Sequence, residues 1–313
     1  MTQSSETPVL EIGGTHVTAA CVDLSAPCVV ADTVVRHGLD GHACTDEFIA
    51  TILAAARSLP LPDARVWGVA IPGPFDYARG ICHFHNVGKF DALRGLDLGA
   101  RLRAELTSGT GRVQFVNDAQ AFLIGEWVAG VAAGHHRVIG VTLGTGVGSA
   151  FLSGGAVVDR GPGVPPQGHL HLLTVAGASL EDMISRRAIR DRYAVLLGTE
   201  RTKVPDLREI AERVRTGDEI ANLAMREPLE ALGEVLAPRA IAFGASRLVV
   251  GGSIARSWDV VKAALQSGMD RAEPGWWRSV ELVRGQRLEE SALLGAASVV
   301  ATGSCNVRCR NGP

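Results

Sequence analysis

The stretch VIGVTLGTGVGSAFLSGGAVV, at residues 138–158, decides the fold. It carries no charge and is long enough by itself to cross a membrane. Its glycines, at positions 140, 144, 146, 148, 154 and 155, instead indicate a strand, a glycine turn, a second strand, another turn and a third strand. The stretch therefore predicts a hairpin within a β-sheet, and we expect no transmembrane segment.

The same pattern occurs near the N-terminus, at residues 9–23, where β-branched and small apolar residues flank Gly13-Gly14. Shifting residues 12–17 by 131 positions places them on residues 143–148. Two hairpins with Gly/Thr turns, half a chain apart, indicate a duplicated domain.

The remaining segments fit an α/β fold. Apolar spacing predicts helices at 45–58, 96–106 and 117–131 and strands at 66–71 and 113–116. After Ser179 the pattern is mainly helical, at 179–197, 205–216, 218–243, 257–268 and 288–302, with one strand at 247–250. We expect two duplicated α/β domains facing each other across a cleft. Residues 1–117 and a C-terminal helix at about 290–303 form the first, and residues 118–289 the second.

Composition narrows the class of protein. A chain of 313 residues is about two domains long, at roughly 150 residues each. Its 31 Lys and Arg against 33 Asp and Glu give a net charge of −2, so nucleic acid is not an expected partner. The six cysteines are irregularly spaced and no signal peptide is evident, which predicts a cytoplasmic protein with reduced thiols.

Three glycine turns are candidate phosphate sites: Gly13-Gly14-Thr15, Gly144-Thr145-Gly146 and Gly251-Gly252-Ser253. Without Cβ atoms, backbone N–H groups can approach an anion closely, and the hydroxyls add donors. Each turn alone is explained as an ordinary hairpin turn, but together they favour nucleotide phosphates. A strand follows the Gly144 turn and no P-loop motif occurs, so any nucleotide is held by hairpins.

Asp118 stands where a strand gives way to a helix, which suits a helix-capping carboxylate. The same position can present a carboxylate to a bound hydroxyl, and the two roles are compatible. The His169/His171 and His83/His85 pairs lack a third ligand and make poor metal sites.

Six segments occur in an order typical of one family: LEIGGT at 10–15, Pro72-Gly73-Pro74, HNVGKF at 85–90, VNDAQAFLIGE at 116–126, TLGTGVGSA at 142–150 and VVGGSIA at 249–255. Together they resemble the ROK family of sugar kinases and repressors across nearly the whole chain. The resemblance implies two actin-like ATPase (ribonuclease H-like) domains with ATP and Mg²⁺ in the cleft. It also implies transfer of the γ-phosphoryl group to a sugar hydroxyl, usually the primary one.

The resemblance assigns roles to individual residues. It makes Asp118 the general base, Gly73, Asn86, Asn117, His169 and Glu181 sugar-binding residues, and the first two glycine turns the phosphate contacts. It places Gly252, in the third turn, near the adenosine.

Three departures alter these expectations. Glu11 stands where the family has Asp, which affects how Mg²⁺ is held through water. Pro166 replaces a sugar-binding glutamate, so we expect an altered sugar such as kanosamine, or a C7-cyclitol. Residues 170–179 lack the family's zinc-binding cysteines, so no structural zinc is expected.

Two alternatives to a kinase remain. A repressor of this family carries a DNA-binding segment before the first motif, and only ten residues precede Glu11 here. A catalytically weak or inactive sugar sensor would explain Glu11 and Pro166, but Asp118 argues against it. The choice between ATP and polyphosphate as donor stays open, and family habit suggests a homodimer.

Overall fold

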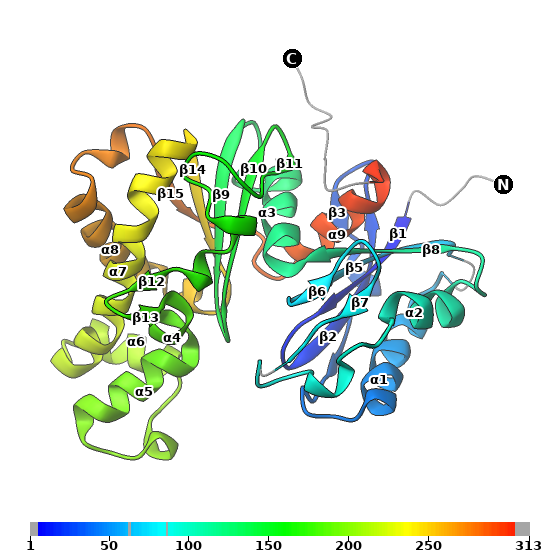
Figure 1. Ribbon diagram of the computed structural model, residues 1–313, viewed down its shortest axis with the longest axis horizontal. Helices are drawn as coiled ribbons and strands as arrows, with labels where there is room; N and C mark the ends of the chain where they lie inside the picture. The colour runs from blue at the N-terminus through cyan, green and yellow to red at the C-terminus, as the bar shows by residue number, and fades with distance from the viewer. Residues whose placement is uncertain (1–5, 62–63, 86, 304–313) are drawn as a thin grey trace. The chain divides into compact units, whose positions relative to one another are not determined.

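The computed structural model describes residues 6–61, 64–85 and 87–303, which form two compact units (Figure 1). The first comprises the described residues of Met1–Gly134, Gly154–Ala156 and Glu289–Pro313, and the second His135–Ser153 and Val157–Leu288. This division differs from the expected boundary after residue 117, because α3 (Asp118–Ala129) packs against α9 (Ser291–Thr302) in the first unit.

The first unit is built on a six-stranded mixed sheet. Its strands are β1 (Glu6–Ile12), β2 (His16–Asp23), β3 (Cys28–Val29), β4 (Val35–Gly38), β5 (Val66–Ile71) and β8 (Arg112–Asn117). The order is β3-β2-β1-β5-β8, with β4 also paired to β2. β1 runs antiparallel to β2 and parallel to β5, and β5 runs parallel to β8.

The second unit repeats this plan. Its sheet has the order β11-β10-β9-β14-β15, from β9 (Arg137–Leu143), β10 (Val147–Ser153), β11 (Ala156–Val157), β14 (Arg247–Gly251) and β15 (Glu281–Arg284). β9 runs antiparallel to β10 and parallel to β14, which runs parallel to β15. A hairpin beside two parallel strands therefore occurs in both units, as the duplication predicts.

Alternate residues of β5 face opposite sides of the first unit's sheet. Trp67, Val69 and Ile71 face the apolar cluster that includes residues of α1 (Thr45–Arg57) and α2 (Leu98–Leu106). Gly68 faces the other side, where a Cβ would lie 2.5 Å from the Ala296 carbonyl oxygen of α9. Helices therefore cover both faces of the sheet.

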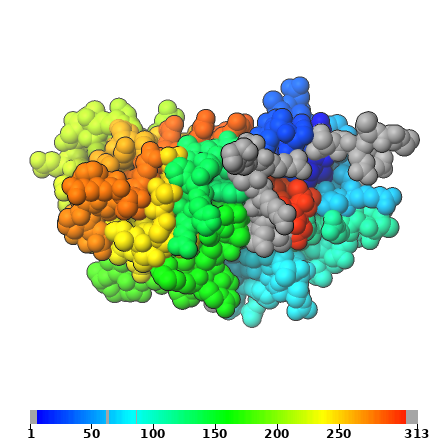
Figure 2. All heavy atoms as spheres, turned by 90° about the horizontal axis from the view of Figure 1, so that it is seen from above, coloured from blue at the N-terminus to red at the C-terminus, as the bar shows by residue number. Residues whose placement is uncertain are grey.

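Glycines also set the closest helix contacts. In α3 and α9, Cβ atoms at Gly125 and Gly295 would each lie 1.9 Å from a carbonyl oxygen of the other helix. In the second unit, α7 (Glu219–Phe243) and α8 (Trp258–Ala272) lie side by side (Figure 2), and Gly268 meets a carbonyl oxygen of α7 in the same way. These helices pack backbone against backbone.

Several local expectations need correction. The strand expected at 247–250 has a parallel neighbour, β15, that the sequence analysis missed. The helix expected at 179–197 is two helices, α4 (Leu180–Ile184) and α5 (Arg186–Leu197), because Ser185 adopts extended backbone and accepts from the Ala188 amide to begin α5. α6 (Leu207–Arg215) follows. Within the described residues, no helix has both the length and the apolar character needed to cross a bilayer.

Candidate functional site

The first unit's candidate residues gather at one edge of its sheet. β1, β5 and β8 are parallel, with Glu11 opposite Ala70 and Ile71 opposite Asn117. Because the carboxyl ends of parallel strands meet at the same edge, the Gly13 turn, the Gly73 loop and Asp118 all follow strands that end there. Asn86 and residues 304–313 lie outside the described residues.

The strand-to-helix junction at β8 places Asp118. Asn117 caps α3, and its Oδ1 accepts from the Ala119 amide at 3.0 Å and the Gln120 amide at 3.3 Å. Asp118 Oδ1 also accepts from Ala119, at 2.9 Å. Both side chains are half-buried, so capping and a chemical role coexist at this position.

Tyr77 is a residue of this cluster that the sequence analysis missed. Its hydroxyl accepts from Asn117 Nδ2 at 3.0 Å and donates to the Ile71 carbonyl at 3.3 Å. Burial raises the pKa of Tyr77, so the phenol stays protonated. A Cβ at Gly73 would lie 3.4 Å from the same hydroxyl. Tyr77 thus connects the Gly73 loop to the start of α3.

Glu11 and Asp118 interact electrostatically. Burial, and then the charge of Asp118, raise the pKa of Glu11 to about 7, while Arg36 opposes the shift. A divalent cation would relieve the repulsion between two carboxylates, and oxygen ligands suit Mg²⁺. The residues therefore fit Mg²⁺ held through water. Among the described residues, no group of three or more His, Cys, Asp or Glu side chains forms a metal cluster.

The first glycine turn is a tight hairpin. Gly13 N–H donates to the His16 carbonyl at 2.8 Å, and Leu39 N–H donates to the Thr15 carbonyl at 2.9 Å. Because the Gly13 amide is used within the hairpin, a phosphate at this turn would use Gly14 and Thr15. A Cβ at Gly13 would lie 3.3 Å from the His16 carbonyl oxygen.

In the second unit, the other two glycine turns are neighbours. β9 and β14 are parallel, with Gly251 opposite Thr142, so the turns after them share one sheet edge. Gly252 has a φ of 82°, and a Cβ there would lie 2.3 Å from the Leu143 carbonyl oxygen. Only glycine fits this conformation and contact. A Cβ at Gly144 would lie 3.7 Å from Ser253 Oγ.

Glu181 lies against the Gly144 turn. A Cβ at Gly146 would be 3.1 Å from Glu181 Oε1. Gly144 N–H donates to the Gly146 carbonyl at 3.0 Å, and Arg186 N–H donates to the Gly144 carbonyl at 2.8 Å. The second unit thus brings one expected sugar-binding carboxylate to an expected phosphate turn, where Thr145 and Gly146 would be the phosphate donors.

His169 follows the short 3₁₀ helix Pro166–Gly168. Burial, and then His171, lower the pKa of His169, which favours the neutral imidazole. Pro166 is exposed, and its side chain has no hydrogen-bond acceptor. Ser149 Oγ holds this segment, donating to the Gly168 carbonyl at 2.5 Å and accepting from the Leu170 amide at 2.9 Å.

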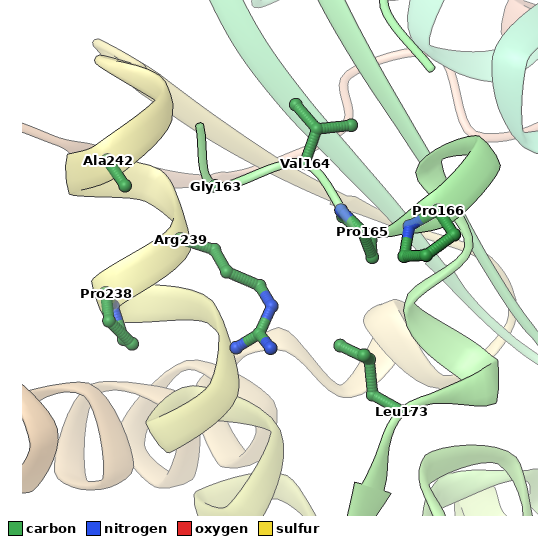
Figure 3. Close-up of a pocket in the computed structure, with 8 residues that line it drawn as sticks. All are labelled: Gly163, Val164, Pro165, Pro166, Leu173, Pro238, Arg239 and Ala242. Atoms are coloured by element: carbon green, nitrogen blue, oxygen red, sulfur yellow. The ribbon is translucent and has the colours of Figure 1, made fainter. Parts of the chain in front are cut away.

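A hollow of about 350 Å³ lies beside this segment (Figure 3). Arg239 extends into it from α7, and prolines and Leu173 form much of its wall. Its lining residues are Gly163, Val164, Pro165, Pro166, Leu173, Pro238, Arg239 and Ala242. None of the expected sugar or phosphate residues is among them.

Comparisons with known proteins agree on one family. The model of the ROK family matches residues 8–302. A glucokinase from Thermotoga maritima is 26% identical, over 93% of this chain and 96% of its own. A ROK family glucokinase from Streptomyces griseus, solved with glucose and AMPPNP, is 25% identical at a TM-score of 0.76, covering 95% of this chain and all of its own.

The family also includes regulators. The structure of a ROK family transcriptional regulator, a homologue of the E. coli MLC protein, is 19% identical at a TM-score of 0.72, covering 93% of this chain and 76% of its own. The likeness to these structures confirms the predicted actin-like ATPase fold.

Proposed function

This chain belongs to the ROK family, and we propose that it is a sugar kinase that transfers the γ-phosphoryl group of ATP to a hydroxyl, preferentially the primary one, of a sugar or sugar-like polyol. The observation that carries the proposal is Asp118, held at the start of α3 beside the capping amide of Asn117. The glucokinase names of its relatives support the same class of reaction.

Asp118 would act as general base. Its carboxylate would accept the proton of the acceptor hydroxyl as the oxygen bonds to phosphorus, while Asn117 orients that hydroxyl. Phosphoryl transfer has a loose transition state, so positioning and charge neutralisation matter more than early deprotonation. Gly73, Asn86, His169 and Glu181 would complete the contacts to the acceptor.

The donor would be ATP with Mg²⁺, supported by the AMPPNP in the Streptomyces griseus structure. Glu11, whose carboxyl interacts electrostatically with that of Asp118, would hold Mg²⁺ through water, and the ion would neutralise charge on the phosphates. The amides of Gly14, Thr15, Thr145 and Gly146 would contact phosphate oxygens. Gly251, Gly252 and Ser253 would lie near the adenosine.

The proposed acceptor is an altered sugar. Pro166 removes a glutamate that other family members use to bind sugar, so an amino sugar such as kanosamine, or a C7-cyclitol, fits this chain better than plain glucose. Initial rates with glucose, kanosamine and a cyclitol test the point. Glucose as the best acceptor by kcat/KM would remove the proposal.

The kinase itself is tested by ADP release. Asp118→Asn keeps the side-chain shape and an acceptor for the Ala119 amide, so we expect a folded protein with kcat lowered about 10²- to 10⁴-fold. Asp46→Asn removes a charge from the first turn of α1 and serves as the matched control. A variant at Asp118 with unchanged kcat would contradict the assigned role. Nucleotide binding without turnover on any acceptor would instead support the inactive sensor.

The homodimer stays a prediction, which light scattering at several protein concentrations tests.

A further inference from the structure

Lys89 lies against the first glycine turn. A Cβ built on Gly14 would be 3.2 Å from Lys89 Nζ and 3.5 Å from its Cδ. Both residues belong to the first unit, and the lysine side chain is half-buried. The first candidate phosphate turn therefore has a positive charge beside it.

Phe90, the residue after Lys89, fixes the backbone from which the lysine side chain extends. Phe90 N–H donates to the Gly41 carbonyl at 2.6 Å, and the Phe90 side chain is 1% exposed. Its ring meets Phe48 and Phe84 edge-on, with centroids 5.2 and 5.3 Å apart. Lys89 therefore extends from an anchored backbone.

The loop at Gly41, to which Phe90 is bonded, also packs against the first glycine turn. A Cβ at Gly41 would lie 3.0 Å from Lys89 Cβ and 3.5 Å from the Gly14 carbonyl oxygen. The Leu39 amide, two residues before Gly41, donates to the Thr15 carbonyl. Three loops are thus packed together, with the Lys89 side chain between them.

The Lys89 ammonium lies against an aromatic ring. In the described part of the chain, no carboxylate pairs with its ammonium, which instead lies over the Phe90 ring, 5.6 Å from Nζ to the centroid. A partly desolvated ammonium without an anionic partner is unfavourable, so this position favours an anionic ligand.

We propose that Lys89 binds the terminal phosphate oxygens of the nucleotide at the Gly13-Gly14-Thr15 turn. This inference rests on the proposed function and adds to it a side-chain cation for the transferred group. The ammonium would donate hydrogen bonds to those oxygens and offset the charge that the transfer spreads over them. An acidic group on the acceptor is the competing ligand, and the contact with Gly14 favours the donor phosphate.

Calorimetric titration with ATP, ADP and AMP tests this without requiring turnover. Lys89→Met is expected to weaken ATP binding about 10- to 100-fold and to leave AMP binding unchanged, since AMP lacks the terminal phosphates. Lys89→Gln should show the same nucleotide dependence, and Lys89→Arg should recover part of the loss. Lys203→Met, which removes an exposed lysine from the second unit, is the matched control.

Steady-state kinetics supply the second readout. With Lys89→Met, kcat/KM for ATP should fall about 10- to 100-fold, while KM for the acceptor stays constant. Equal losses for ATP and AMP, unchanged ATP affinity, or a loss confined to the acceptor KM would each overturn the proposal. A wild-type chain without turnover would refute the proposed function, and the comparison of ATP with AMP would still decide the role of Lys89.

Discussion

Gly295→Ala tests the closest helix contact in the first unit. The added Cβ would lie 1.9 Å from the Ala121 carbonyl oxygen and 2.6 Å from its carbonyl carbon, whereas ordinary contacts begin at 3.4 Å. Both atoms are backbone, so α3 and α9 must separate by about 1.5 Å to relieve the overlap. Alanine by itself would stabilise a helix by about 1 kcal/mol relative to glycine.

Overpacking costs about 1–3 kcal/mol, and separating two helices adds lost contacts. We therefore expect a net destabilisation of about 2 kcal/mol, or a Tm lower by roughly 4–8 °C. Differential scanning calorimetry measures it. Gly99→Ala in α2 is the control, because its nearest contacts would be 3.3 Å and its stability should stay within about 1 kcal/mol of wild type. A Gly295→Ala protein as stable as wild type would refute the close approach.

Three further predictions concern activity and pH. Tyr77→Phe removes the hydroxyl that accepts from Asn117, so the acceptor KM should rise about 3- to 10-fold while ATP affinity, followed by calorimetry, stays unchanged. The pKa of Glu11 is raised from 4.5 to about 7, so the folded chain binds this proton more tightly than the unfolded chain does. The protonated Glu11 therefore stabilises the fold fully below pH 4.5, and this stabilisation is lost as the pH rises to about 7. Glu11→Gln should flatten the dependence of Tm on pH over that range. Burial alone would raise the pKa of Glu230, but hydrogen bonds from two arginines and a serine lower it overall. The ionised Glu230 therefore stabilises the fold above its usual pKa, and this stabilisation is lost as the pH falls. In urea unfolding, Glu230→Gln should lower the free energy of unfolding more at pH 7 than at pH 3.

The sequence predicts the fold best where the signal is local. Paired glycines between β-branched runs define the turn at Gly13, and an Asn-Asp junction defines the start of α3. The short strand β15 has only four residues, and its place in the sheet depends on pairing with β14. Its own residues therefore carry too weak a signal to predict it.

Close approaches are also invisible in a single sequence. Gly125 and Gly295 interrupt apolar helices, where glycine ordinarily lowers helix propensity. Glycine is required at each position because a carbonyl oxygen of the other helix, more than a hundred residues away along the chain, lies where a Cβ would be. Only the packed structure shows that contact.

Some residues of the candidate site can likewise be predicted from the sequence, and others cannot. Asp118 and the glycine turns carry recognisable local patterns, so the amino-acid sequence alone is enough to propose them. Tyr77 and Lys89 contact neighbours far along the chain, Asn117 and the Gly14 turn. Tyr77 lies in none of the quoted family segments, and Lys89, although it lies within HNVGKF, carries no local pattern that predicts a contact with the Gly14 turn.

The Asn117 amide also limits what can bind beside Asp118. Its Oδ1 already accepts two backbone N–H groups, and one Nδ2 hydrogen goes to Tyr77. Among the described residues the second Nδ2 hydrogen has no acceptor. It can meet a lone pair of an alcohol oxygen but cannot receive the alcohol's hydrogen. An alcohol held there has to turn its O–H bond away from the amide and toward the adjoining carboxylate. The residue that caps α3 would thus direct the hydroxyl proton toward the carboxylate of Asp118.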